Sequence, residues 1–170
     1  MRSGWYSLRW YALAALVVVL DQVTKGIADG ALEYGRPVEV FSWFNLTLQY
    51  NTGAAFSFLS DAGGWQRYFF SLIAVVISAV LVAWLYLMPR DQKLLALALA
   101  LILGGALGNL WDRLVFGHVV DFISVHYGGR YFPAFNIADS AITLGAACMI
   151  FDSIFGREGD RPVERGINPK

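Results

Sequence analysis

The chain has 170 residues, of which 57% are hydrophobic and 15% charged, whereas a soluble domain carries about 25% charged residues. Its 13 basic and 13 acidic residues cancel, so the sequence gives no electrostatic support for a nucleic-acid partner. A single cysteine, Cys148, excludes an internal disulfide. The composition indicates a membrane protein, and the length fits one compact unit, which we expect to be a single integral-membrane domain over residues 1–170.

Four hydrophobic runs have about the 20 residues that a helix needs to cross a bilayer. They cover about residues 8–28, 67–88, 94–114 and 136–155. The two central runs are the clearest, because no charged residue lies between Arg67 and Arg90 or between Lys93 and Asp112. A cleaved signal peptide is the alternative for the first run. That run is long for a signal peptide and has no A-x-A-like site followed by a polar mature domain.

Basic residues predict the orientation, because short loops rich in lysine and arginine stay in the cytoplasm. Such residues lie before or at the start of the first run, between the second and third, and after the fourth: Arg2, Arg9, Arg90, Lys93, Arg157, Arg161, Arg165 and Lys170. Both termini are therefore expected in the cytoplasm. The connections at about 29–66 and 116–135 are then expected outside.

The outer connections predict a small sheet on the membrane surface. Residues of about 36–60 include VEVFSWF and LTLQY, which are rich in β-branched and aromatic side chains, followed by an Asn-Thr-Gly break. The second connection contains either a short strand or a re-entrant piece. The polar tail at about 157–170 is expected to be disordered. The predicted fold is a mainly α membrane protein with four transmembrane helices and a small extracytoplasmic β-sheet.

This topology brings polar residues from distant parts of the chain to one level near the outer leaflet. They are Asp21, Lys25, Asn109, Asp112, Arg113, Asp121, Asn136 and Asp139. Asp21 and Lys25 form an i,i+4 pair, and the spacing of Asn109, Asp112 and Arg113 places them on one helix face. Glycines in the third run, Gly104, Gly105 and Gly108, are expected to let helices approach closely.

Asp121 and Asp139 are the strongest candidates for chemistry, because an ionisable group near a membrane is costly unless it has a function. Two adjacent carboxylates share a proton, so that one activates water while the other polarises a carbonyl, as in an aspartic peptidase. The alternative is that both are interfacial charges or helix caps, since aspartate favours helix N-termini.

Other chemistries have weaker support. His118 and His126 flank Asp121 without a cysteine or a third histidine, and no H-E-x-x-H is present, so neither a metal nor another cofactor is expected. No G-x-S-x-G is present either, so serine catalysis has little support. Ser140, which lies beside Asp139, is the one serine that remains a candidate. A small transporter is a rival hypothesis, but its pathway needs polar groups at several depths, and the two central runs lack charge. A structural assembly subunit is the third hypothesis.

Five ordered motifs carry a resemblance to a known family: DQVTK from Asp21, NTGAAFS from Asn51, GGALGNLWDR from Gly104, VVDFI from Val119 and FNIADS from Phe135. In these the chain resembles bacterial lipoprotein signal peptidase, the type II signal peptidase. The resemblance spans roughly residues 8–155, and no motif position departs from it. It implies that Asp121 and Asp139 are a catalytic dyad. The implied supporting residues are Asn51, Gly53, Asn109, Arg113, Asn136, Asp21 and Lys25.

The resemblance also implies a substrate and a location. The substrate is a membrane-anchored prolipoprotein, cut before a diacylglyceryl-modified cysteine. Globomycin-like cyclic peptides are implied inhibitors. The enzyme is expected as a monomer in the lipid bilayer of the bacterial inner membrane, with its active site near the outer leaflet.

The roles of the supporting residues stay open. Asn51, Asn109 and Asn136 either bind the substrate backbone, orient the acids and stabilise an oxyanion, or form interhelical hydrogen bonds. Arg113 neutralises Asp112 or organises the site. Asp21 and Lys25 are expected to be structural.

Overall fold

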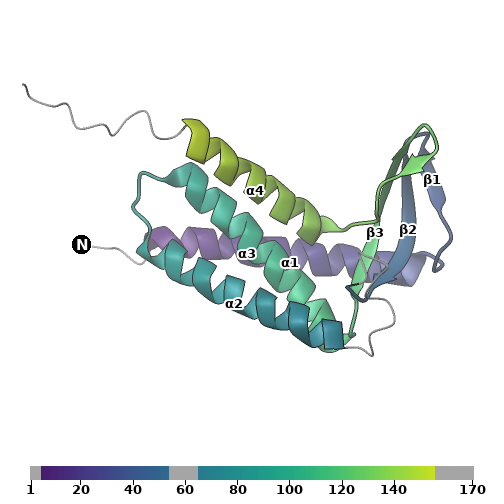
Figure 1. The fold of residues 1–170 in the computed structure, drawn as a ribbon, viewed down its shortest axis with the longest axis horizontal. Helices are drawn as coiled ribbons and strands as arrows, with labels where there is room; N and C mark the ends of the chain where they lie inside the picture. The colour runs from purple at the N-terminus through teal and green to yellow at the C-terminus, as the bar shows by residue number, and fades with distance from the viewer. Residues whose placement is uncertain (1–4, 54–64, 156–170) are drawn as a thin grey trace, which may run out of the picture.

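The computed structural model describes residues 5–53 and 65–155 and contains a bundle of helices with a sheet at one end (Figure 1). In chain order the elements are α1 (Trp5–Ala31), β1 (Val38–Phe41), β2 (Phe44–Asn51), α2 (Trp65–Leu87), α3 (Lys93–Val115), β3 (Val119–Tyr127), β4 (Arg130–Tyr131) and α4 (Ile137–Phe155). All four helices are long and apolar enough to cross a membrane. The predicted fold class, mainly helical with a small antiparallel sheet, is confirmed. The tail at about 157–170 lies outside the described residues.

Helix α3 is the central helix of the bundle. In its most apolar stretch 56% of residues are buried, against 17–28% in the other three helices, and it packs against all of them. Its apolar side chains form a core with those of α1 and α2, made of Ala14, Leu81, Leu85, Met88, Ala96, Leu99 and Leu103. The other helices expose much of their apolar surface, as expected for helices that face lipid.

Glycines bring α3 close to its neighbours, as the sequence predicts. A Cβ added to Gly104 would lie 2.7 Å from the carbonyl oxygen of Ala14 in α1. One added to Gly105 would overlap the carbonyl oxygen of Ala138 at the start of α4. Because these obstacles are backbone atoms, only a shift of a whole helix would make room for a side chain.

Gly105→Ala is therefore expected to destabilise the protein by about 1–3 kcal/mol, the usual cost of overpacking. Gly26→Ala in α1 is the matched control, since a Cβ there meets nothing within 4 Å. Alanine favours a helix over glycine, so the control should be neutral or stabilising by up to about 1 kcal/mol. Unfolding of both variants in detergent measures the difference, and equal stabilities would contradict the close-approach explanation.

One antiparallel sheet contains all four strands, in the order β1-β2-β3-β4. The two connections that were predicted to lie outside thus combine, with β1 and β2 from the first and β3 and β4 from the second. Of the two predictions for the second connection, the strand is correct. The sheet lies at one end of the bundle. The start of α1, the α2–α3 connection and the end of α4 lie at the other (Figure 1).

Helix α1 continues past its expected end near residue 28 to Ala31. Helix α1 contacts β3, and its end lies at the sheet end of the bundle (Figure 1). Residues 29–31 are exposed, and Asp29 among them accepts the hydroxyl of Tyr50 from β2 at 2.7 Å. This extension holds the sheet beside the polar residues of α1.

Candidate active site

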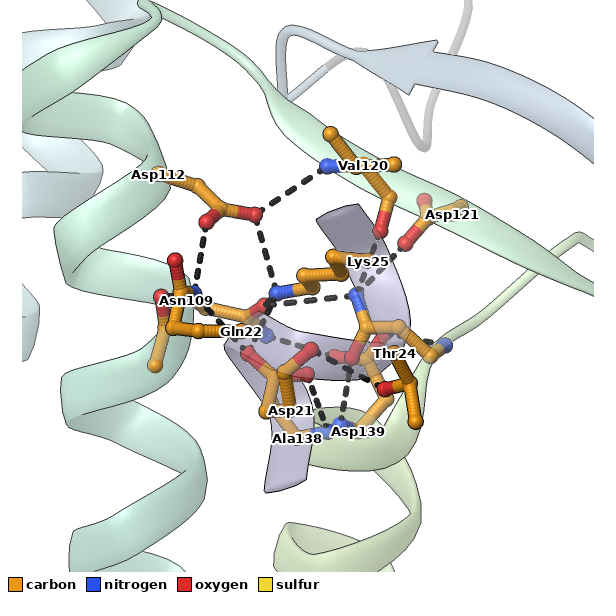
Figure 2. A network of polar contacts seen from close by, with 12 residues as sticks. Asp21, Gln22, Thr24, Lys25, Asn109, Asp112, Val120, Asp121, Ala138 and Asp139 are labelled. Atoms are coloured by element: carbon orange, nitrogen blue, oxygen red, sulfur yellow. Dashed lines mark hydrogen bonds and ion pairs between the residues drawn. The ribbon is translucent and has the colours of Figure 1, made fainter. Parts of the chain in front are cut away.

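The predicted polar residues gather where the sheet meets the helix ends. Figure 2 shows the part of their network of hydrogen bonds and ion pairs around Lys25 and Asn109. The network joins residues from α1, α3, β2, β3 and the start of α4: Asp21, Lys25, Asn51, Asn109, Asp121, Asn136 and Asp139. Gly53 and Arg113 lie at its edges.

Asp121 lies on β3 with only 2% of its surface exposed. Its Oδ1 accepts a hydrogen bond from Asn136 Nδ2 at 2.7 Å, and its Oδ2 accepts one from Asn51 Nδ2 at 3.0 Å. The sheet register places Asn51 opposite Val119 and Gln49 opposite Asp121. Asn51 and Asp121 are therefore diagonal neighbours on one face of the sheet.

The side chain of Asn51 is held in turn by Gly53. Asn51 Oδ1 accepts the backbone N–H of Gly53 at 2.9 Å, which aims the amide nitrogen at Asp121. Gly53 has φ +96°, a conformation that side chains disfavour. A Cβ at this position would also lie 2.8 Å from the ring of Phe70. Backbone conformation and space both require glycine here.

Asp139 lies in the first turn of α4, three residues after Asn136. Asn136 Oδ1 accepts the N–H of Asp139 at 2.9 Å, and Asp139 Oδ2 accepts the N–H of Asn136 at 3.3 Å. This reciprocal arrangement has the form of a capping box. Asp139 therefore makes the hydrogen bonds of a helix cap, which was the alternative explanation for this residue. It does not exclude a second role, because Asp139 Oδ1 accepts from Asn109 Nδ2 at 2.8 Å.

Asn136 is the direct link between the two acids. It is fully buried, donates from its side chain to Asp121 and caps α4 together with Asp139. Its Nδ2 also lies 3.3 Å from Asn109 Oδ1. Ser140 donates its hydroxyl to the Asn136 carbonyl at 2.9 Å, so this hydroxyl belongs to the first turn of the helix.

Lys25 lies behind the acids, 3% exposed. Its ammonium group is 2.7 Å from Asp21 Oδ2, 2.9 Å from Asp112 Oδ2 and 2.8 Å from Asn109 Oδ1. The three contacts match the three protons of the ammonium group. The predicted i,i+4 pair of Asp21 and Lys25 is confirmed.

Arg113 does not form the ion pair with Asp112 that was one of its two expected roles. Within residues 5–53 and 65–155, the ion pair of Asp112 is with Lys25. Arg113 instead donates weakly to the carbonyl of Asn109 at 3.4 Å and lies over the ring of Phe70 at 5.6 Å. Adjacent residues on a helix do not face the same way, which explains why Asp112 turns from its neighbour.

Asp112 was predicted to lie in the polar cluster but was not among the supporting residues that the resemblance implied, and Gln22 was in neither set. Gln22 Nε2 donates to Asp112 Oδ1 at 2.8 Å and lies 3.2 Å from Asp21 Oδ2. The i,i+3 spacing of Asn109 and Asp112 was the signal for Asp112. Gln22 follows Asp21 directly and carried no spacing signal of its own.

Burial raises the pKa of the Asp121 carboxyl to about 6 from its ordinary value of 3.8, and the nearby Asp139 carboxylate adds to the rise. Hydrogen bonds from Asn51 and Asn136 and the positive charge of Lys25 act in the opposite direction. The rise in the pKa caused by burial is larger than the lowering caused by these partners. Asp121 therefore holds a proton to a higher pH than an ordinary aspartate does.

This raised pKa predicts how stability depends on pH. The folded state binds the Asp121 proton more tightly than the unfolded state, so this group stabilises the fold below about pH 4 and the contribution is lost as pH rises toward 6. Its full size is at most about 3 kcal/mol. Asp121→Asn cannot ionise, so it should raise Tm more near pH 7 than near pH 4. An equal change in Tm at both pH values would contradict the raised pKa.

A pocket of about 300 Å³ opens onto this site. Its lining includes Asp121 and Asn51, with Gln49, Tyr50, Thr52, Pro133 and Ala134. Each carboxylate oxygen of Asp121 and Asp139 accepts one hydrogen bond from the protein. Since a carboxylate has about four acceptor positions, capacity remains for a water molecule and a shared proton. The arrangement is suited to general acid–base attack on a carbonyl group by water.

The sequence matches a family model described as signal peptidase (SPase) II over residues 13–155. Among curated proteins, the lipoprotein signal peptidase of Pseudomonas fluorescens is 59% identical over 147 residues, covering 85% of this chain and 86% of that protein. That of Acinetobacter baumannii is 56% identical over 157 residues, covering 92% of this chain and 89% of that protein. That of Teredinibacter turnerae is 54% identical over 150 residues, covering 88% and 89%.

Two solved structures of bacterial membrane enzymes share the fold. One has a TM-score of 0.78 and 34% sequence identity, covering 91% of this chain and 94% of that chain. The other has a TM-score of 0.77 and 36% identity, covering 86% and 93%. The likeness therefore extends over the helices and the sheet together.

Proposed function

Because this chain belongs to the signal peptidase II family, we propose that Asp121 and Asp139 are its catalytic dyad. The chain is an integral protein of a bacterial membrane and a peptidase that removes signal peptides from prolipoproteins. The dyad proposal rests above all on Asn136, which hydrogen-bonds to both carboxyl-bearing residues from one buried position.

In the proposed mechanism the two acids share one proton and a water molecule lies between them. Asp121 holds the proton, since burial raises the pKa of its carboxyl group. Asp139 takes a proton from the attacking water as general base. Asp121 donates its proton to the carbonyl oxygen as the tetrahedral intermediate forms. The pair titrates as a unit, so a pH–rate profile reports the dyad and not either acid alone.

The asparagines are positioning residues in this proposal. Asn51 and Asn136 orient Asp121, while Asn109 orients Asp139. Each of the three asparagines donates a hydrogen bond to an acid. Of the two expected roles, substrate binding and orienting the acids, this contact favours orienting the acids. Asp21 and Lys25 have no hydrogen bond to either acid's side chain among the described residues, which supports a structural role.

The membrane placement is part of the proposal. Arg9, Arg90 and Lys93 lie at the end of the bundle away from the sheet, so the rule for basic residues puts that end, with both termini, in the cytoplasm. The dyad then lies near the outer leaflet. There a lipid attached to the substrate can stay in the bilayer while the peptide bond reaches the acids. We treat the chain as a single membrane domain that acts as a monomer.

The proposed cleavage position is tested with a purified prolipoprotein in two forms, with and without diacylglycerol on its cysteine. The chain should cut the lipidated form immediately before that cysteine and cut the unmodified form far more slowly. A globomycin-like cyclic peptide should block the reaction. Equal cleavage of both forms would overturn the lipid requirement. Ion flux across the membrane of vesicles that contain the protein, without any cleavage, would favour the transporter hypothesis.

A further inference from the structure

Two buried acids outside the dyad each accept a hydrogen bond from the residue just before a dyad aspartate. Asp112 Oδ2 accepts the backbone N–H of Val120 at 3.2 Å, and Val120 precedes Asp121. Asp21 Oδ1 accepts the backbone N–H of Ala138 at 2.9 Å, and Ala138 precedes Asp139. The same type of contact thus occurs at both dyad positions, from different helices (Figure 2).

Lys25 joins these two acids. Its ammonium group lies 2.7 Å from Asp21 and 2.9 Å from Asp112, and all three side chains are at most 3% exposed. We call these three residues the Lys25 cluster. A continuous path of short polar contacts therefore runs from the backbone beside Asp121 to the backbone beside Asp139, through Asp112, Lys25 and Asp21.

We propose that the Lys25 cluster sets the separation of the two dyad carboxyl groups, with Asp112 and Asp21 as positioning residues. This inference rests on the proposed function, because it assigns a role relative to that dyad. Asp121 lies on a strand and Asp139 on a helix, and these elements come from different parts of the chain. The cluster fixes both backbones to a common point at the level where the chemistry takes place.

Removing the contact to Val120 frees β3 next to Asp121 while leaving the hydrogen bonds of the Asp121 side chain in place. A shift of about 1 Å at a reacting group lowers a rate by up to about a hundredfold. Substrate binding by the rest of the site is untouched. The effect should therefore fall on kcat, with little change in KM.

A pH–rate profile gives a second measure of the separation. The charged groups around Asp121 are Asp139 from α4, Lys25 from α1 and Arg113 from α3. When the two carboxyl groups move apart, their repulsion weakens and the shared proton is held less tightly. The high-pH limb of the profile should then move to lower pH. A general loss of folded protein lowers the rate but leaves this limb in place.

The experiment compares Asp112→Ala with Asp112→Asn in cleavage of a diacylglyceryl prolipoprotein. Alanine removes the acceptor for Val120, whereas asparagine removes the charge but keeps an oxygen for the N–H. We expect Asp112→Ala to lower kcat by about ten- to a hundredfold and to move the high-pH limb downward. Asp112→Asn should retain more activity and show a smaller movement. If Asp112→Ala does not fold, Asp112→Asn tests the proposal alone. A reduced kcat with the high-pH limb moved downward would support the proposal, and a wild-type kcat with an unmoved limb would overturn it.

Thr24→Val is the matched control. Thr24 lies next to Lys25 on α1, and its hydroxyl donates within that helix to the carbonyl oxygens of Leu20 and Asp21. It should keep kcat close to that of the wild type and an unchanged pH profile. A loss as large as that of Asp112→Ala would overturn the proposal, because any missing polar contact would then have the same effect. So would a wild-type kcat in folded Asp112→Ala.

The outcomes for the dyad and for the cluster are separable. If the wild type cleaves and the dyad variants do not, while folded Asp112→Ala is fully active with an unmoved limb, only the cluster proposal fails. If a folded dyad variant cleaves normally, the proposed function fails first, and the cluster proposal fails with it.

Discussion

Asp121→Asn and Asp139→Asn should each lower kcat for prolipoprotein cleavage by at least about a hundredfold, the scale of a lost general acid or base. Asparagine keeps the shape of aspartate and removes the group that gains or loses a proton. With one acid left, the pair no longer combines an ionised base with a protonated acid. Single-turnover cleavage of a diacylglyceryl prolipoprotein measures the chemical step directly.

The control for this loss is Asp29→Asn. Asp29 is an exposed acid near the end of α1 that accepts the Tyr50 hydroxyl at 2.7 Å. Its substitution removes an equal charge close to the site and should leave kcat within a few-fold of the wild type. All three variants have to show wild-type helix content and membrane insertion. Near-normal cleavage by either folded dyad variant would contradict the assignment of Asp121 and Asp139 as the catalytic dyad.

Lys25→Met should destabilise the protein by about 3–5 kcal/mol, the cost of removing one partner from a buried ion pair. Methionine fills much of the space of the lysine chain but leaves Asp21 and Asp112 without their shared cation. Both acids are at most 1% exposed, so each would be left as a buried charge without its cation. Unfolding of the purified protein in detergent measures the loss.

Arg36→Met is the comparison for Lys25→Met. Arg36 pairs with Glu33, but their side chains are 75% and 68% exposed. Exposed pairs contribute little, because water and salt screen both charges. Little change is therefore expected for Arg36→Met under the same conditions. If the two substitutions cost the same, burial is not what makes the Lys25 pairs important.

The two explanations considered for Asp139 describe one arrangement. Its backbone and one carboxylate oxygen complete the cap of α4, while the other oxygen accepts from Asn109. The cap fixes the side chain at the helix start, which is where a dyad member must be held. Rigid placement by a helix terminus and acid–base chemistry are therefore compatible in the same residue.

Much of the site could be predicted from the sequence because its signals are local. The i,i+4 spacing of Asp21 and Lys25 is confirmed as an ion pair at 2.7 Å. Runs without charge located α2 and α3, since a helix in lipid cannot carry free charges at little cost. The order of the motifs indicated the family, which the comparisons then showed.

The partners of Asp112 could not be predicted in this way. Arg113 is its neighbour in sequence, but the contact goes to Lys25, which lies more than eighty residues away on another helix. Likewise, no pattern in the chain indicated that Asp21 accepts the N–H of Ala138. Such contacts depend on which helix faces meet, and the close approach at Gly105 and Gly108 decides that.

The sequence by itself determined the spans, the polar residues at their ends and the family, because hydrophobicity, charge and motif order are properties of short segments. Only the tertiary structure decided how Asn136 joins Asp121 to Asp139 and how Lys25 joins the acids behind them. Those contacts depend on angstrom-scale distances between segments remote in the chain. Helix packing and strand register fix such distances, and residue spacing along the sequence does not encode them.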